Sequence, residues 1–134
     1  MPHRIMIVDE SGSSYAHQNS TLIAATATAA TLTTSLTNFF HRGAYWVLNI
    51  GTETTAPSVT FRIHGIADDG TFFSLMSSAA QTATNTAVLF SLYPGQAETA
   101  NQHVDGILPR RYRAMVDSGN DATPTYSVTE VRLL

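Results

Sequence analysis

Three arginines, Arg110, Arg111 and Arg113, form the densest group of side chains in this sequence that could bind a ligand. Guanidinium groups bind phosphate well, so this cluster could contact a nucleic-acid backbone. The chain as a whole opposes that function, because its seven basic residues face ten acidic ones and its formal net charge is -3. We therefore predict no nucleic-acid partner. We interpret the cluster as a solvated strand face, or as one that forms salt bridges between subunits.

The remaining groups that could perform chemistry do not combine into a site. None of the five histidines stands at the HxH or HxxxH spacing that is typical of metal ligands. Those histidines are His3, His17, His41, His64 and His103. Asp68, Asp69 and Gly70 start like a calcium-binding loop, but the later ligands are missing. No serine lies in the G-x-S-x-G pattern of hydrolases, and there is no cysteine, so we predict no cofactor, no metal and no enzymatic activity.

The composition favours a protein that stays in contact with other subunits. The length of 134 residues fits one domain with one core. Charged residues make up 13% of the chain, about half the usual share of about 25%, and all seven basic residues are arginines. Without lysine, the surface lacks a common means of keeping exposed strand edges apart. A homo-oligomer is therefore expected.

The first 19 residues are predicted to form an extended N-terminal arm, and residues 20–134 a single domain. The arm carries one short apolar run, followed by the loop-forming sequence SGSS, and has no adjacent strand with which to pair. That run consists of Ile5, Met6, Ile7 and Val8. It is far too short to cross a membrane, so we predict no membrane partner and expect the run to dock on a neighbouring subunit. The alternative is that residues 4–8 form an edge strand of their own domain.

Alternation of apolar and polar residues predicts β-strands through the rest of the chain. Residues 21–28 alternate and should form a strand, followed by an irregular segment. In the strand at 44–50, Trp46 shares one face with Leu48 and Ile50, which favours a place in the core over a sugar-binding platform. The strand at 59–64 should lead through the Asp-Gly turn at 69–70 into an antiparallel return strand. Further strands are expected at 86–93, 111–116 and 125–134.

In two of these strands the alternation predicts which side chains face the core and which face the solvent. In RRYRAMV, Tyr112 should face the core and Arg111 and Arg113 the solvent. In the last strand Tyr126 and Val128 should point inward, which would also bury the charged Glu130. We expect a bulge near residue 129 to turn that carboxylate outward. About seven short strands separated by turns predict an all-β fold, either an antiparallel β-sandwich or a jelly-roll-like barrel.

The sequence LPRRYRAMVDSGNDATPTYSVTEVRLL, which ends the chain, resembles the head-decoration or cement proteins of tailed bacteriophages. The similarity lies in a proline, an arginine-aromatic-arginine strand, a Gly/Asn/Asp turn, the residues TYSV and an apolar end. The central sequence YWVLNIG with PSVTFRIHGI resembles the family more loosely. The resemblance implies a β-rich, non-catalytic virion protein on the capsid surface, which binds the major capsid protein and assembles as a trimer or other small oligomer.

Two other functions fit the same fold. A tail or head-closure protein of the same phage type could contain a similar sandwich. A carbohydrate-binding module on a larger assembly could stack sugars on its aromatic side chains. Those side chains are Tyr45, Trp46, Tyr93, Tyr112 and Tyr126.

Overall fold

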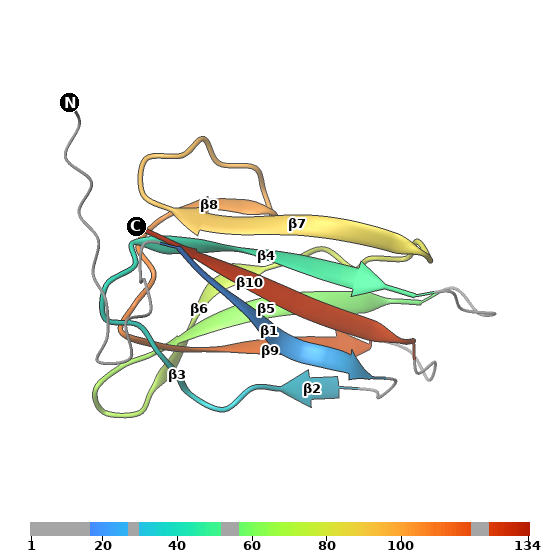
Figure 1. Ribbon diagram of the computed structural model, residues 1–134, viewed down its shortest axis with the longest axis horizontal. Helices are drawn as coiled ribbons and strands as arrows, with labels where there is room; N and C mark the ends of the chain where they lie inside the picture. Colours follow the sequence, from blue (N-terminus) through green and yellow to red (C-terminus); the bar gives the residue numbers. More distant parts are fainter. Residues whose placement is uncertain (1–16, 27–29, 52–56, 119–123) are drawn as a thin grey trace.

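A computed structural model describes residues 17–26, 30–51, 57–118 and 124–134, and in this part of the chain all regular structure is β-strand. The strands form two sheets that pack face to face (Figure 1). This confirms the predicted all-β sandwich. Seven strands are six residues or longer, and three short ones supplement them.

The first sheet has the strand order β1-β10-β4-β7-β8. Its strands are β1 (His17–Thr26), β10 (Tyr126–Leu133), β4 (Gly43–Ile50), β7 (Thr86–Tyr93) and β8 (His103–Asp105). All neighbours are antiparallel except β7 and β8, which run parallel. The segment between the predicted strands at 86–93 and 111–116 therefore contains an additional short strand.

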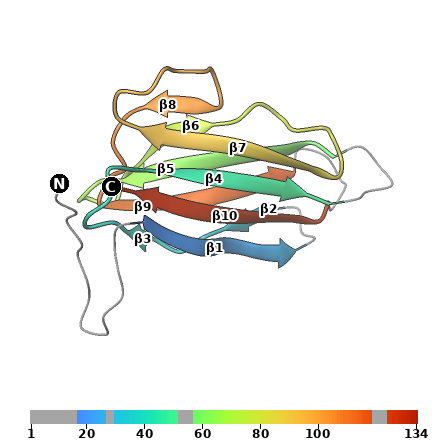
Figure 2. The ribbon, with the colours of Figure 1, turned by 45° about the horizontal axis from the view of Figure 1, so that its top comes forward.

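The second sheet has the strand order β2-β9-β5-β6, with β3 also pairing with β9. Its strands are β2 (Ala30–Leu32), β9 (Arg111–Ser118), β5 (Val59–Ile66), β6 (Phe72–Ser77) and β3 (Leu36–Thr37). β2 and β3 pair with successive parts of β9, from Asp117 to Met115 and from Tyr112 to Arg111. The irregular segment expected after the first strand thus crosses to the second sheet and covers its edge (Figure 2).

The core lies between the two sheets and follows the predicted alternation. Val59, Phe61 and Ile63 of β5 are fully buried, while the residues between them are only partly buried. Trp46 of β4 is fully buried as well, and its ring lies 6.0 Å from that of Phe61. Phe61 in turn contacts Phe90 of β7, with ring centroids 5.2 Å apart. Aromatic pairs at these distances add to the stability gained by burial alone.

The turn between β5 and β6 forms the predicted hairpin, but it is not a two-residue primed turn. The amide of Gly70 donates to the carbonyl of Ala67, and the amide of Ala67 donates to the carbonyl of Thr71. Among the loop residues only Gly70 has a positive φ, of 88°. This is a three-residue loop ending in a glycine bulge, whereas a tight primed turn would need positive φ at its first central residue as well.

The prediction for the last strand is wrong in one important respect. β10 pairs with β4 without interruption, so Glu130 lies opposite Trp46 and points into the core, where it is 1% exposed. The irregularities occur in β1 instead, between Thr21 and Ile23 and between Ile23 and Thr26. Glu130 stays inside because its carboxylate finds hydrogen-bond donors there.

Of the predicted arm, the structure describes only residues 17–19, and they belong to β1, which pairs with β10. Ile5, Met6, Ile7 and Val8 lie outside the described residues. Their docking on a neighbour, and the division of the chain at residue 19, stay predictions.

Candidate interaction surface

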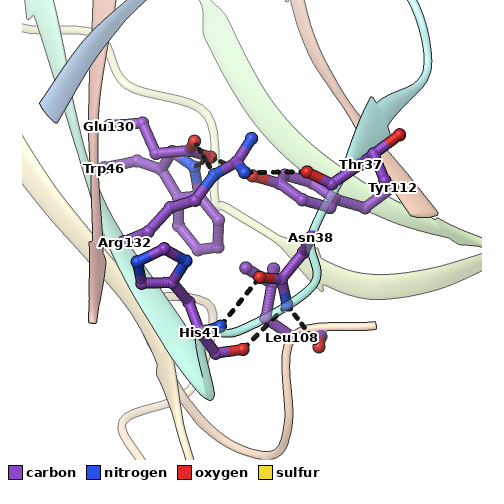
Figure 3. Close-up of polar contacts among 8 residues, drawn as sticks. All are labelled: Thr37, Asn38, His41, Trp46, Leu108, Tyr112, Glu130 and Arg132. Atoms are coloured by element: carbon purple, nitrogen blue, oxygen red, sulfur yellow. Dashed lines mark hydrogen bonds and ion pairs between the residues drawn. The ribbon is translucent and has the colours of Figure 1, made fainter. Parts of the chain in front are cut away.

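Two loops at one end of the sandwich, residues 38–42 and 106–110, are joined into one surface, which we call the end surface. Asn38 is its central clamp (Figure 3). The Nδ2 group of Asn38 donates to the carbonyls of His41 at 2.7 Å and of Leu108 at 3.1 Å, and its Oδ1 accepts from the amide of His41 at 3.0 Å. Backbone bonds from Asn38 to Arg110 and from Leu108 to Arg42 complete the junction. These loops are thus held in a fixed conformation.

What the end surface presents outward is largely apolar. Phe39 is 65% exposed, Phe40 49% and Ile107 67%, although they are large hydrophobic side chains. The guanidinium of Arg110 lies over the ring of Phe39, 5.3 Å from its centroid. These residues border a shallow hollow of about 460 Å³. Exposed apolar groups clustered on a rigid surface are typical of protein-protein contact sites.

A second polar network fixes the end surface from behind. In the core, Glu130 Oε2 accepts from the indole of Trp46 and from the hydroxyl of Tyr112, both at 2.7 Å. Glu130 Oε1 accepts from Arg132 Nε at 2.9 Å, and Arg132 also donates to the carbonyl of Thr37 at 2.8 Å. Thr37 directly precedes Asn38 in the chain (Figure 3). The network therefore fixes the backbone just before Asn38.

The electrostatics of this network follow from burial. Desolvation, and then the negative charge of Glu130, raise the pKa of Tyr112 well above its ordinary value, so the phenol stays protonated and can donate. In the described part of the chain, no buried side-chain nitrogen or oxygen lacks a hydrogen-bond partner. Satisfied in this way, the carboxylate acts as an internal brace between the two sheets.

The three clustered arginines do not form a joint phosphate site. Arg110 belongs to the end surface, Arg111 donates to the carbonyl of Ala67 at 2.7 Å, and Arg113 stacks on Phe72, 3.5 Å from the ring centroid. Arg113 also approaches His64 on the outer face of the sheet. Burial, and then the positive charges of Arg113 and Arg62, lower the pKa of His64. The predicted outward orientation of Arg111 and Arg113 is confirmed.

The other candidate groups take structural positions. Asp69 accepts a hydrogen bond from the amide of Thr71, which stabilises the hairpin turn and lowers the pKa of that carboxyl. Among the described residues no three His, Asp or Glu side chains gather as metal ligands. No helix in the described ranges is long and apolar enough to span a membrane.

The aromatic residues considered for sugar binding divide into two groups. Trp46, Tyr112 and Tyr126 are at most 1% exposed and cannot serve as stacking platforms. Tyr45 and Tyr93 border a shallow groove of about 280 Å³ on the outer face of the first sheet, together with the exposed Leu89. The Tyr93 hydroxyl is already bonded to the carbonyl of Leu134, which leaves the groove mainly apolar.

Sequence reasoning missed the end surface. Phe39 and Phe40 have helical spacing with Leu32 and Leu36, which gives no indication of a surface, and Ile107 directly follows the polar stretch 96–106. The signal that was available is the occurrence of large apolar residues in segments without strand alternation. Such residues are not needed for a sheet face, and here Phe39, Phe40 and Ile107 are exposed at one end of the sandwich.

Comparison with known proteins gives a fold and no family. No protein-family model and no curated protein matches the sequence. The structure is similar to that of the SPBc2 prophage-derived protein YomS, with a TM-score of 0.50 and 11% sequence identity over 87% of this chain and 91% of YomS. A chain in the structure of infectious bursal disease virus Gt strain is more distant, with a TM-score of 0.40 and 13% identity; the match covers 98% of this chain but 36% of that one. At such identity the match to YomS establishes a shared sandwich fold.

Proposed function

We propose that this protein is a structural component of a tailed-phage virion, a decoration or cement protein that assembles with copies of itself and binds the major capsid protein on the outside of the head. The observation that carries the proposal is the end surface, a rigid pair of loops that exposes Phe39, Phe40 and Ile107. A ligand-binding site is typically a concave pocket that encloses most of the ligand and orients it with a few polar groups. Here the scaffold holds apolar groups outward.

Three further features support this function. The C-terminal sequence resembles the decoration-protein family, and the sandwich is shared with a prophage-derived protein. The surface contains few charges and no lysine, which suits continuous contact with other subunits. Several strand edges also end the sheets, including β1, β8 and β6, and offer main-chain groups to a neighbour. The role is mechanical, and involves neither catalysis, a cofactor, nucleic acid nor a membrane.

Two measurements test the proposal on the full-length chain. Light scattering after size exclusion should give the mass of a small oligomer, most simply a trimer, and not the 14.4 kDa of a single chain. Shells assembled from the major capsid protein of the same genome should then bind the protein in co-sedimentation. The double variant Phe39→Asp/Ile107→Asp should reduce assembly while remaining folded, because both side chains are mostly exposed. Binding of the wild type to purified tails but not to heads would contradict the assignment to the capsid.

A further inference from the structure

The end surface lies at the place where the N-terminal segment leaves the domain. His17, the first residue of β1, pairs with Leu133, and the carbonyl of Leu133 accepts from the amide of Arg42 in the end surface. β1 runs away from this end, as both ribbon views show (Figures 1 and 2). The chain before His17 therefore starts directly beside the loops that present Phe39 and Ile107.

Two properties of the N-terminal sequence match this surface. The run Ile5 to Val8 is apolar, and the exposed part of the end surface is apolar as well. Asp9 and Glu10 follow the run directly, while Arg42 and Arg110 are exposed beside the aromatic rings. Among the described residues, neither of these arginines forms an ion pair. The N-terminal segment can therefore make apolar contacts and ion pairs with the end surface at the same time.

The length of the connection indicates which copy of the chain supplies the segment. Val8 stands nine residues before His17 and, at about 3.3 Å per residue, an extended connection spans roughly 30 Å. The chain's own end surface begins within a few residues of the exit point, so a spacer of nine residues is longer than that contact needs. An extended spacer reaches the corresponding surface of an adjacent molecule.

We propose that the end surface binds residues Ile5 to Val8 of a second copy of this chain, with Asp9 and Glu10 of that copy facing Arg42 and Arg110. The inference rests on the proposed homo-oligomer and names the contact that holds it together. Phe39 and Ile107 supply the apolar floor of the site, and Asn38 keeps the two loops that carry them in register. Each copy then contributes one surface and one segment.

The chain contains no cysteine, so single cysteines can report this contact without background. Full-length Met6→Cys and Ile107→Cys proteins are mixed and oxidised under mild conditions. A disulfide between the two variants is expected to form about a hundredfold faster than in free solution, because docking raises the effective thiol concentration from about 10 micromolar to about 1 millimolar. The matched control pairs Met6→Cys with Thr82→Cys, an exposed residue at the opposite end of the sandwich, and should show no such acceleration.

A further variant and a mass measurement separate the outcomes. Adding Phe39→Asp to the Ile107→Cys chain should remove the acceleration, while circular dichroism stays that of the wild type. In a double variant carrying both cysteines, a disulfide closed within one chain would overturn docking on a second copy. An oligomer in light scattering that forms no Met6-to-Ile107 disulfide overturns this inference alone. A monomer without that disulfide overturns the proposed homo-oligomer as well.

Discussion

The indole of Trp46 donates a 2.7 Å hydrogen bond to Glu130, the residue directly opposite it on the neighbouring strand. Tyr112, from the other sheet, donates to the same oxygen at 2.7 Å. One carboxylate thus joins both sheets through the core, and Arg132 balances its charge at 2.9 Å. Burial of a charge is tolerated when its partners are buried with it, and this arrangement meets that condition.

Replacing Glu130 by Ala should destabilise the fold by about 3 kcal/mol, because Trp46, Tyr112 and Arg132 would all lose their acceptor. Glu130→Gln keeps one acceptor and should cost about 1 to 3 kcal/mol. Urea unfolding followed by circular dichroism gives both values. The exposed Glu98→Ala serves as the control, with an expected change within about 0.5 kcal/mol. Equal stability of all three variants would show that the network contributes nothing.

Alkaline pH should weaken the protein through Tyr112. Its pKa is raised in the folded state by burial and by Glu130, whereas in the unfolded chain it titrates near pH 10. Its contribution is therefore complete below pH 10 and is lost above it at about 1.4 kcal/mol per pH unit, because the unfolded state releases the proton first. Tyr112→Phe should unfold more easily at neutral pH, by about 1 kcal/mol, and show a shallower alkaline slope. Parallel slopes for the two proteins would contradict this.

Trp46 is the single tryptophan and is 0% exposed, so it should report folding and not ligand binding. In the native state acrylamide should quench its fluorescence weakly, and urea should shift the emission to the red. A glycan panel should leave the native spectrum unchanged. A saturable shift with any sugar would revive the carbohydrate-binding alternative and require an opening of the core.

The arginines of β9 should not bind DNA, because Arg111 and Arg113 are already engaged by Ala67 and Phe72 and the chain carries a net charge of -3. Gel shift at low salt with duplex and single-stranded DNA should show no complex at micromolar protein. If a salt-sensitive complex forms and disappears when Arg110, Arg111 and Arg113 are changed to Ser, the prediction is wrong.

Deleting residues 1–12 should separate assembly from folding. β1 begins at His17, so every described strand remains in the truncated chain, and its melting temperature should stay close to that of the full chain. Oligomer mass and capsid binding should fall. A truncated domain that unfolds would instead place residues 4–8 in its own sheet, which is the alternative that the sequence leaves open.

The alternation of side chains was sufficient to predict the long strands and the two faces of β5 and β9. It could not predict the position of Glu130, because a charged residue on an inward position violates the pattern unless its partners are known. Trp46 and Tyr112 lie 84 and 18 residues away along the chain. Only the sheet order brings them together, and no local rule contains that order.

The same limit applies to the parts of the fold made by short segments. The strand β8 is three residues long and runs parallel to β7. It is held by side chains such as Gln96, whose Nε2 donates to the carbonyl of Val104 at 2.6 Å. The end surface likewise depends on one amide, Asn38, that bridges residues 70 positions apart. Contacts of this kind leave no periodicity in the sequence.

The place of β10 in the first sheet also determines the order in which the molecule can be built. β10 follows every other described strand in the chain, yet it lies between β1 and β4. During synthesis, β1 and β4 are made long before the strand that joins them, and the carboxylate brace arrives with that same strand. Pairings this distant in sequence make folding slow. Until β10 is made, β1 and β4 lack the strand that lies between them, and unpaired strand edges of this kind are prone to aggregation.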